Sequence, residues 1–159
     1  MTGDEFVAVA RRLCFSHVIL IPDSELGQWE PALQTAQEPT LIRPTREGEG
    51  IGIAAGLMLG GKRPLVVIQC TGLFEAGDAL RNVVHDLKLP LRLIVGVRSY
   101  LAYSKGHSID SCPIFTEPIL RAWQIPYEFL PPQYTPLNLE TALTRQMERG
   151  TAGAVLIPE

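Results

Sequence analysis

The sequence predicts an α/β protein of the doubly wound class, a three-layer α/β/α arrangement around a six-stranded, mainly parallel sheet. Short apolar runs alternate with longer amphipathic segments, which is the pattern of β-α-β units. The apolar runs are continuous rather than alternating, as in strands that are covered on both faces. The six predicted strands are His17–Ile21, Thr40–Ile42, Pro64–Gln69, Leu91–Val97, Tyr127–Leu130 and Gly153–Ile157.

Helices are predicted between these strands. The first follows a capping box formed by Thr2 and Glu5 and runs from Gly3 to Cys14. The second is interrupted by Pro31. Residues 69–73 are expected to form a turn, and residues 98–113 form a loop longer than a simple connection requires. The second predicted helix spans residues 25–37, a third lies within residues 43–61, and the others span residues 75–87, 113–123 and 137–149.

Length and composition predict one globular domain over residues 1–159, because no linker rich in Pro, Gly or Ser divides the chain. The net charge of −3 and the absence of a basic run argue against nucleic acid or an anionic membrane as a partner. No apolar run reaches the roughly 20 residues of a membrane span. Three scattered cysteines and a polar, acidic N-terminus lead us to expect a cytoplasmic protein, and no metal site is expected within the chain.

The segment from Arg43 to Gly61 has an unusual composition for a helix. Thr45 is a candidate N-cap, and the carboxylates of Glu47 and Glu49 lie in the first turn, where the helix dipole favours negative charge. Glycine recurs every fourth residue and forms one ridge, although each glycine costs about 1 kcal/mol relative to alanine. The ridge indicates a close approach, either of another backbone in the same chain or of a partner subunit or cofactor. Its glycines are Gly48, Gly52, Gly56 and Gly60.

Other candidate site residues follow the predicted strands. Pro22-Asp23-Ser24 is a turn and helix cap, at an edge where open α/β sheets place ligands. Cys70 and Thr71 follow the third strand, where a buried cysteine is the ordinary alternative to a site role. His107, with Lys105 and Arg98, forms either a solvated loop or an anion-binding corner.

Nucleotide-binding motifs are weak or missing. Gly50-Ile51-Gly52-Ile53-Ala54-Ala55 fits G-x-G-x-x-A, but it lies inside a predicted helix and lacks the later acidic residue. The chain has no G-x-x-x-x-G-K-[ST] and no G-x-S-x-G motif.

Several of these motifs together resemble one family. The stretch from Glu47 to Gly56 resembles the helix that begins with the activating glutamate in the pyrimidine-binding domain of thiamine-diphosphate enzymes. Glu47 stands nine residues before the Gly of Ala54-Ala55-Gly56, as in that family. Ile21 to Ser24, Gly61 to Leu73 and Ala79-Leu80 resemble sulfopyruvate decarboxylase α subunits and the matching half of phosphonopyruvate decarboxylases.

The resemblance implies that Glu47 is catalytic and hydrogen-bonds the aminopyrimidine of thiamine diphosphate, with Pro22, Thr71 and Gly72 also at the cofactor. It implies Ser24, Cys70 and His107 as candidate substrate contacts and a small anionic 2-oxo acid, such as sulfopyruvate or phosphonopyruvate, as the substrate. A closed, poorly solvated site favours the protonated carboxyl of Glu47, which can then act as a proton donor.

The same resemblance implies a partner. In the family, the diphosphate and Mg²⁺ are held by a second domain that carries Gly-Asp-Gly, a motif missing from these 159 residues. We therefore expect a β subunit with that domain, and α subunits that can also associate with one another. Two alternatives remain open: a non-catalytic nucleotide- or anion-binding module, and a regulatory subunit that keeps the fold and the interface.

Overall fold

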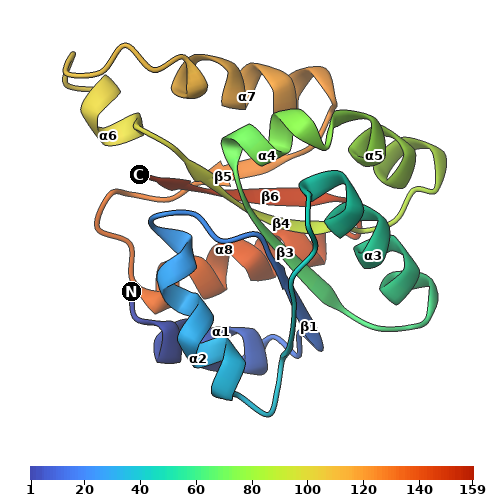
Figure 1. Cartoon of the computed structure of the whole chain (residues 1–159). Coiled ribbons are helices and arrows are strands. Elements are labelled where there is room, and N and C mark those ends of the chain that lie inside the picture. Colours follow the sequence, from blue (N-terminus) through green and yellow to red (C-terminus); the bar gives the residue numbers. More distant parts are fainter.

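The structure, a computed structural model that describes residues 1–159, is built on a six-stranded sheet between two helical layers (Figure 1). All five strand pairings are parallel, and the strand order is β2-β1-β3-β4-β6-β5. The predicted doubly wound class is confirmed, and the sheet is wholly rather than mainly parallel. Its strands are β1 His17–Leu20, β2 Thr40–Ile42, β3 Pro64–Gln69, β4 Arg92–Val97, β5 Tyr127–Phe129 and β6 Gly153–Pro158.

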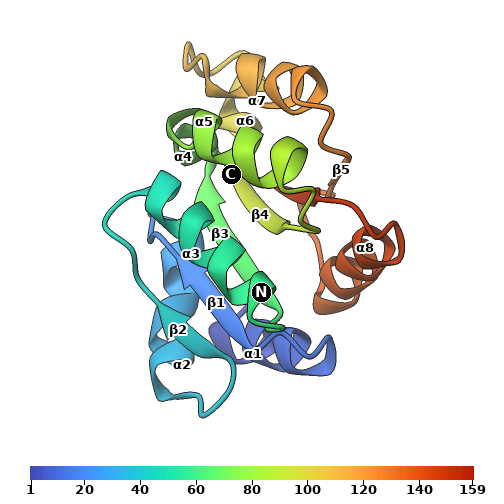
Figure 2. The same cartoon turned by 90° about the vertical axis from the view of Figure 1, so that its right-hand side faces the viewer.

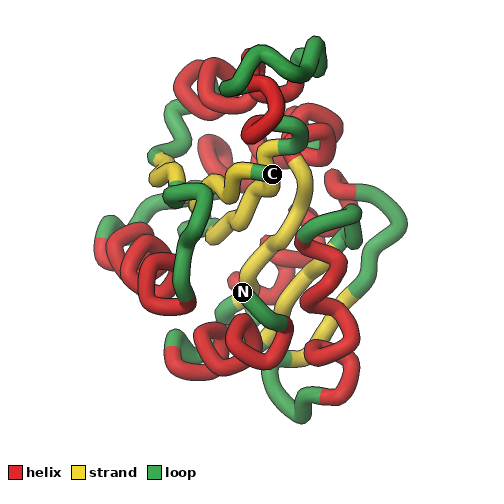
Figure 3. Tube along the Cα trace, turned by 90° about the vertical axis from the view of Figure 1, so that its left-hand side faces the viewer, coloured by secondary structure: helices red, strands yellow, loops and turns green.

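The central strands are apolar on both faces because helices cover both. Every residue of β4 and of β6 is buried, and the sheet twists through the middle of the molecule (Figure 3). This explains why continuous apolar runs marked these strands to within one or two residues.

Each face of the sheet has its own helical layer and its own apolar core (Figure 2). On one face lie α1 (Gly3–Arg12), α2 (Glu30–Thr35) and α8 (Pro136–Glu148). The other face carries the helices that follow β2, β3 and β4. These are α3 (Glu47–Leu59), α4 (Cys70–Glu75), α5 (Gly77–Arg81) and α7 (Cys112–Ala122).

Local sequence signals place two of the helix starts. At α1 the Thr2 hydroxyl accepts from the Glu5 amide at 3.2 Å, and the Glu5 carboxylate accepts from the Thr2 amide at 2.7 Å. Thr135 and Asn138 form the same reciprocal cap at α8. Such caps satisfy amide groups that have no partner inside the helix.

One prediction about elements was wrong, and the structure refines two others. Residues 69–73 form no turn, because α4 begins at Cys70 directly after β3. The helix predicted over residues 75–87 is α5 followed by a π-helical turn, Asn82–Asp86. The long loop contains the short helix α6, Tyr100–Tyr103. Pro31 does interrupt the second predicted helix, and a 3₁₀ turn (Leu26–Trp29) precedes α2.

Candidate functional site

Most of the predicted site residues lie at one edge of the sheet. Pro22 to Ser24 follow β1, Glu47 begins α3 after β2, and Thr71 and Gly72 lie in α4 after β3. Strand order reverses between β1 and β3, because the chain continues from β1 to β2 on one side and then to β3 on the other. Such a switch point, at the carboxyl ends of the strands, is where open α/β sheets bind ligands.

Glu47 contacts Gly72 across this edge. The Glu47 side chain is half-buried and lies where a side chain at position 72 would start: an added Cβ there would sit 2.5 Å from Oε1 and 2.7 Å from Cδ of Glu47. Gly72 itself is buried and has no positive φ, so its lack of a side chain serves this contact rather than a backbone turn.

The Glu47 carboxylate accepts no hydrogen bond within the chain, whereas one oxygen of Glu49 accepts two. Glu49 Oε2 accepts from the amide of Thr45 at 2.7 Å and from its hydroxyl at 2.8 Å. These bonds, the amide first, hold the pKa of Glu49 below its usual range. Of the two carboxylates in the first turn of α3, only Glu47 therefore has both oxygens free of hydrogen bonds within the chain.

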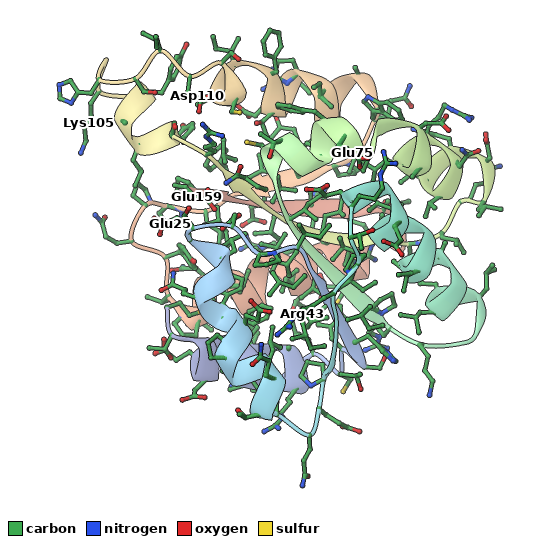
Figure 4. All side chains as sticks on the ribbon, viewed as in Figure 1. Glu25, Arg43, Glu75, Lys105, Asp110 and Glu159 are labelled. Carbon is green, nitrogen blue, oxygen red and sulfur yellow. The ribbon has the colours of Figure 1, made fainter.

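The start of α3 is not capped as the sequence suggested. Thr45 was predicted as the N-cap, but the N-cap residue is Arg46, and its side chain makes no capping bond. Instead, Glu75 at the end of α4 accepts from the Gly48 amide at 2.8 Å and from Arg46 Nε at 2.8 Å. Figure 4 shows Glu75 between α4 and α3. Arg46 and then the Gly48 amide hold the pKa of Glu75 below its usual range.

The bonds from Arg46 and the Gly48 amide to Glu75, called the clamp below, were not predicted from the sequence. Arg46 and Glu75 are 29 positions apart, and neither belongs to a periodic pattern. The clamp ties together the two helices that carry Glu47 and Gly72, so it positions the contact between them.

Of the two other candidate site residues after β3, Thr71 is accessible and Cys70 is not. Its hydroxyl donates to the Gln69 side-chain oxygen at 3.1 Å. Cys70 is fully buried in the core, with an exposed fraction of 0%. The structure therefore gives Cys70 the packing role and does not bring its thiol to the edge as a substrate contact.

The turn after β1 is organised by Asp23. Its Oδ1 accepts from the amides of Glu25 at 2.8 Å and Leu26 at 2.7 Å, which caps the 3₁₀ turn. Pro22 and Ser24 are exposed on either side, and the Ser24 hydroxyl makes no bond within the chain. Both remain open to a ligand at this edge.

A second carboxylate group at the same edge was not predicted. Glu159 follows β6, and Figure 4 shows it beside Glu25, at a cavity of about 260 Å³ that both residues line. Burial, with the charges of Asp23 and Glu25, raises the pKa of Glu159 to about 7. One oxygen of Glu159 and one of Asp23 are buried without a hydrogen-bond partner.

Of the two alternatives at His107, the structure favours the solvated loop over the anion-binding corner. Arg98 Nε lies 3.0 Å from Asp110 Oδ2, so a carboxylate neutralises the arginine. His107 is exposed, and Figure 4 shows Lys105 on the outer part of this loop. No group of three or more His, Cys, Asp or Glu side chains is arranged to hold a metal ion. No helix is long and apolar enough to cross a bilayer.

Comparison with known proteins gives relatives in one group of enzymes. The chain is 33% identical over 86 residues to sulfopyruvate decarboxylase subunit alpha of Methanococcus maripaludis, a match that covers 54% of this chain and 51% of that protein. It is 38% identical over 65 residues to sulfopyruvate decarboxylase of Methanosarcina acetivorans, a match that covers 41% of this chain and 16% of that protein. The matched part thus spans about half of the first relative and less of the second. No protein-family profile matches.

Solved structures share the fold. One is a protein of Mycobacterium smegmatis described as a thiamin diphosphate-dependent enzyme, with a TM-score of 0.72 and 18% identity. Another is benzoylformate decarboxylase of Polynucleobacter necessarius, with a TM-score of 0.71 and 18% identity. Each match covers 99% of this chain and 30% of the other. The chain therefore has the fold of a domain found in these enzymes and resembles the sulfopyruvate decarboxylase α subunit in sequence.

Proposed function

We propose that residues 1–159 form a single pyrimidine-type domain, the α subunit of a thiamine-diphosphate-dependent 2-oxo-acid decarboxylase. The observation that carries the proposal is the free carboxylate of Glu47, which lies over Gly72 at the switch point of the sheet. Thiamine diphosphate, when bound, supplies the electron sink that allows a 2-oxo acid to lose CO2.

The chain's own residues fit the pyrimidine end of that cofactor. Glu47 Oε would hold a proton at the aminopyrimidine N1′, since neither oxygen is committed to another group in the chain. Gly72 would leave room for the carboxylate, and the Glu75–Arg46 pair would fix the first turn of α3. Pro22, Thr71 and Ser24 lie at the same edge, where the cofactor and a small anionic substrate would meet.

We assign the diphosphate and Mg²⁺ to a β subunit. Two observations support this division: the chain has no Gly-Asp-Gly motif, and Glu47 is not among the lining residues of five cavities on this chain. The relative from Methanococcus maripaludis is itself named a subunit alpha. Sulfopyruvate is the first substrate to test, because both relatives carry it in their names.

The experiment combines calorimetry with a matched pair of variants. Thiamine diphosphate and Mg²⁺ are titrated into this chain, into a partner protein that carries Gly-Asp-Gly, and into their mixture, and sulfopyruvate turnover is then measured. We expect tight binding and turnover only in the mixture.

Glu47→Gln should keep the fold and reduce kcat by about a hundredfold or more, the scale of a lost acid–base group. Glu49→Gln is the control, because it changes a neighbouring carboxylate that is bound to Thr45. Normal turnover in Glu47→Gln would remove the assigned role. A mixture that binds the cofactor without turnover would favour a regulatory subunit, and binding by this chain alone would favour a nucleotide-binding module.

A further inference from the structure

A basic pocket of about 430 Å³ lies at the opposite, amino-terminal edge of the sheet. It is bounded by the turn between α3 and β3 at the right of Figure 1, by the start of β4 and by the end of α8. Its lining combines three cations with apolar side chains and contains no carboxylate. The cations are Lys62, Arg63 and Arg92, and the larger apolar side chains include Met58, Leu89 and Met147.

Arg92 is the buried member, with an exposed fraction of 5%. Its Nη1 donates to the Leu91 carbonyl at 3.2 Å and to the Thr151 carbonyl, and its Nη2 donates to the Met147 carbonyl at 3.4 Å. Its Nε is buried and has no partner. Carbonyl groups satisfy hydrogen bonds but bring no full negative charge, and a buried charge without a counter-charge is unfavourable.

The neighbouring cations add to this imbalance. Arg63 donates to the Leu13 carbonyl at 3.0 Å, and neither Arg63 nor Lys62 has a carboxylate oxygen within 4.0 Å. Burial first, and the charge of Arg63 second, lower the pKa of Arg92 to about 10. In contrast, seven of the nine other arginines in the chain pair with Asp or Glu, the exceptions being Arg11 and Arg149.

The partial negative charges at nearby helix ends do not neutralise the three cations of the pocket. The carboxyl ends of α3 and α8 reach this edge, and each contributes a partial charge of about −0.5. Three cations opposed by two such ends leave a clear positive excess in a partly enclosed site. The unmatched charge of Arg92, whose side chain lines the pocket beside Lys62 and Arg63, therefore points to an anion.

We propose that this pocket binds a small organic oxyanion: a phosphate, sulfonate or carboxylate group held by Arg92, Arg63 and Lys62, with its carbon part against Met58, Leu89 and Met147. Its volume lies within the range of about 300–1,000 Å³ of ligand pockets and leaves space beyond the oxyanion group. The 13 residues of α3 separate it from Glu47 by about 20 Å, so it is a different site from the proposed active site.

The test is an NMR titration of the labelled chain at constant ionic strength. The probes are inorganic phosphate, methanesulfonate, acetate and phosphoglycolate, and the reporters are the amides of Gly61 and Gly150, which line the pocket. We expect saturable shifts at these amides, with phosphoglycolate binding more tightly than inorganic phosphate. The order among the first three probes identifies the preferred oxyanion.

Lys62→Gln combined with Arg63→Gln should weaken binding at least about tenfold, because two charged contacts are lost. Both side chains are exposed, so the fold should survive. Lys105→Gln, which removes a cation from the loop at the other edge, is the control and should leave the affinity unchanged. Shifts that never saturate, equal affinity in the double variant, or shifts confined to residues around Glu47 would each overturn the proposal.

Discussion

Replacing Gly72 by alanine tests the contact on which the proposed active site depends. The new Cβ would lie 2.5 Å from Glu47 Oε1 and 2.7 Å from Cδ, whereas ordinary contacts of this kind begin near 3.4 Å. The Glu47 side chain would therefore have to move by about 1 Å. Because a misplacement of about 1 Å can reduce a rate by about a hundredfold, we expect a loss of kcat of that order.

The fold should tolerate this change. Gly72 lies inside α4 without a positive φ, and alanine is favoured over glycine in a helix by about 1 kcal/mol. Thermal unfolding should therefore show an unchanged or higher Tm for Gly72→Ala, while turnover of the complex with its partner falls. Gly77→Ala is the matched control, since its Cβ would meet Trp123 at an ordinary 3.4 Å. Full activity in Gly72→Ala would show that the carboxylate need not occupy this position.

Three further predictions concern single groups. Glu75→Gln should lower Tm at neutral pH. Because Arg46 depresses the pKa of Glu75, the stabilisation by this carboxylate is present above pH 4.5 and is lost as the pH falls. The stability of the variant, measured by unfolding at different pH values, should therefore fall less steeply toward acid pH. For Glu159 the sign is opposite: a pKa raised from 4.5 to about 7 means that stability falls as the pH rises through this window, and Glu159→Gln should remove that slope. The full shift is worth about 3 kcal/mol, reduced by partial exposure to about 1–2 kcal/mol in chemical denaturation. Gly52→Ala should raise the stability of the isolated chain by about 1 kcal/mol, because no atom lies within 4 Å of the new Cβ, and should weaken partner binding measured by calorimetry.

The strands could be predicted because their signal is local. A strand buried on both faces must be apolar along nearly its whole length, as β6 is and as β4 is beyond its first residue, Arg92. The error at residues 69–73 has a tertiary cause. Glycine is common in turns, yet Gly72 lies inside α4, where Glu47 occupies the space that a side chain at this position would need.

The candidate site was predictable only where a motif carried it. Glu47 was predicted through a family resemblance, because its spacing to Gly56 within one helix resembles that of the activating glutamate in thiamine-diphosphate enzymes. The clamp between Arg46 and Glu75 joins two helices, and the raised pKa of Glu159 arises from burial and from charges on another strand's loop. Neither the clamp nor the environment of Glu159 produces a periodic pattern in the sequence, so both become visible only in the three-dimensional structure.

The glycine ridge of α3 links stability to the proposed assembly. Inside the chain, an added Cβ at Gly48 would meet Glu75 Oε2 at 3.5 Å, but Gly52 and Gly56 face open space. Packing within the chain therefore does not explain these two glycines, each of which costs about 1 kcal/mol in a helix. A second backbone against the ridge would offset that cost through close contact. The glycine ridge begins one residue after Glu47, so a chain that covers the ridge would also enclose the Glu47 carboxylate. The same surface would then serve both for subunit association and for closing the proposed active site.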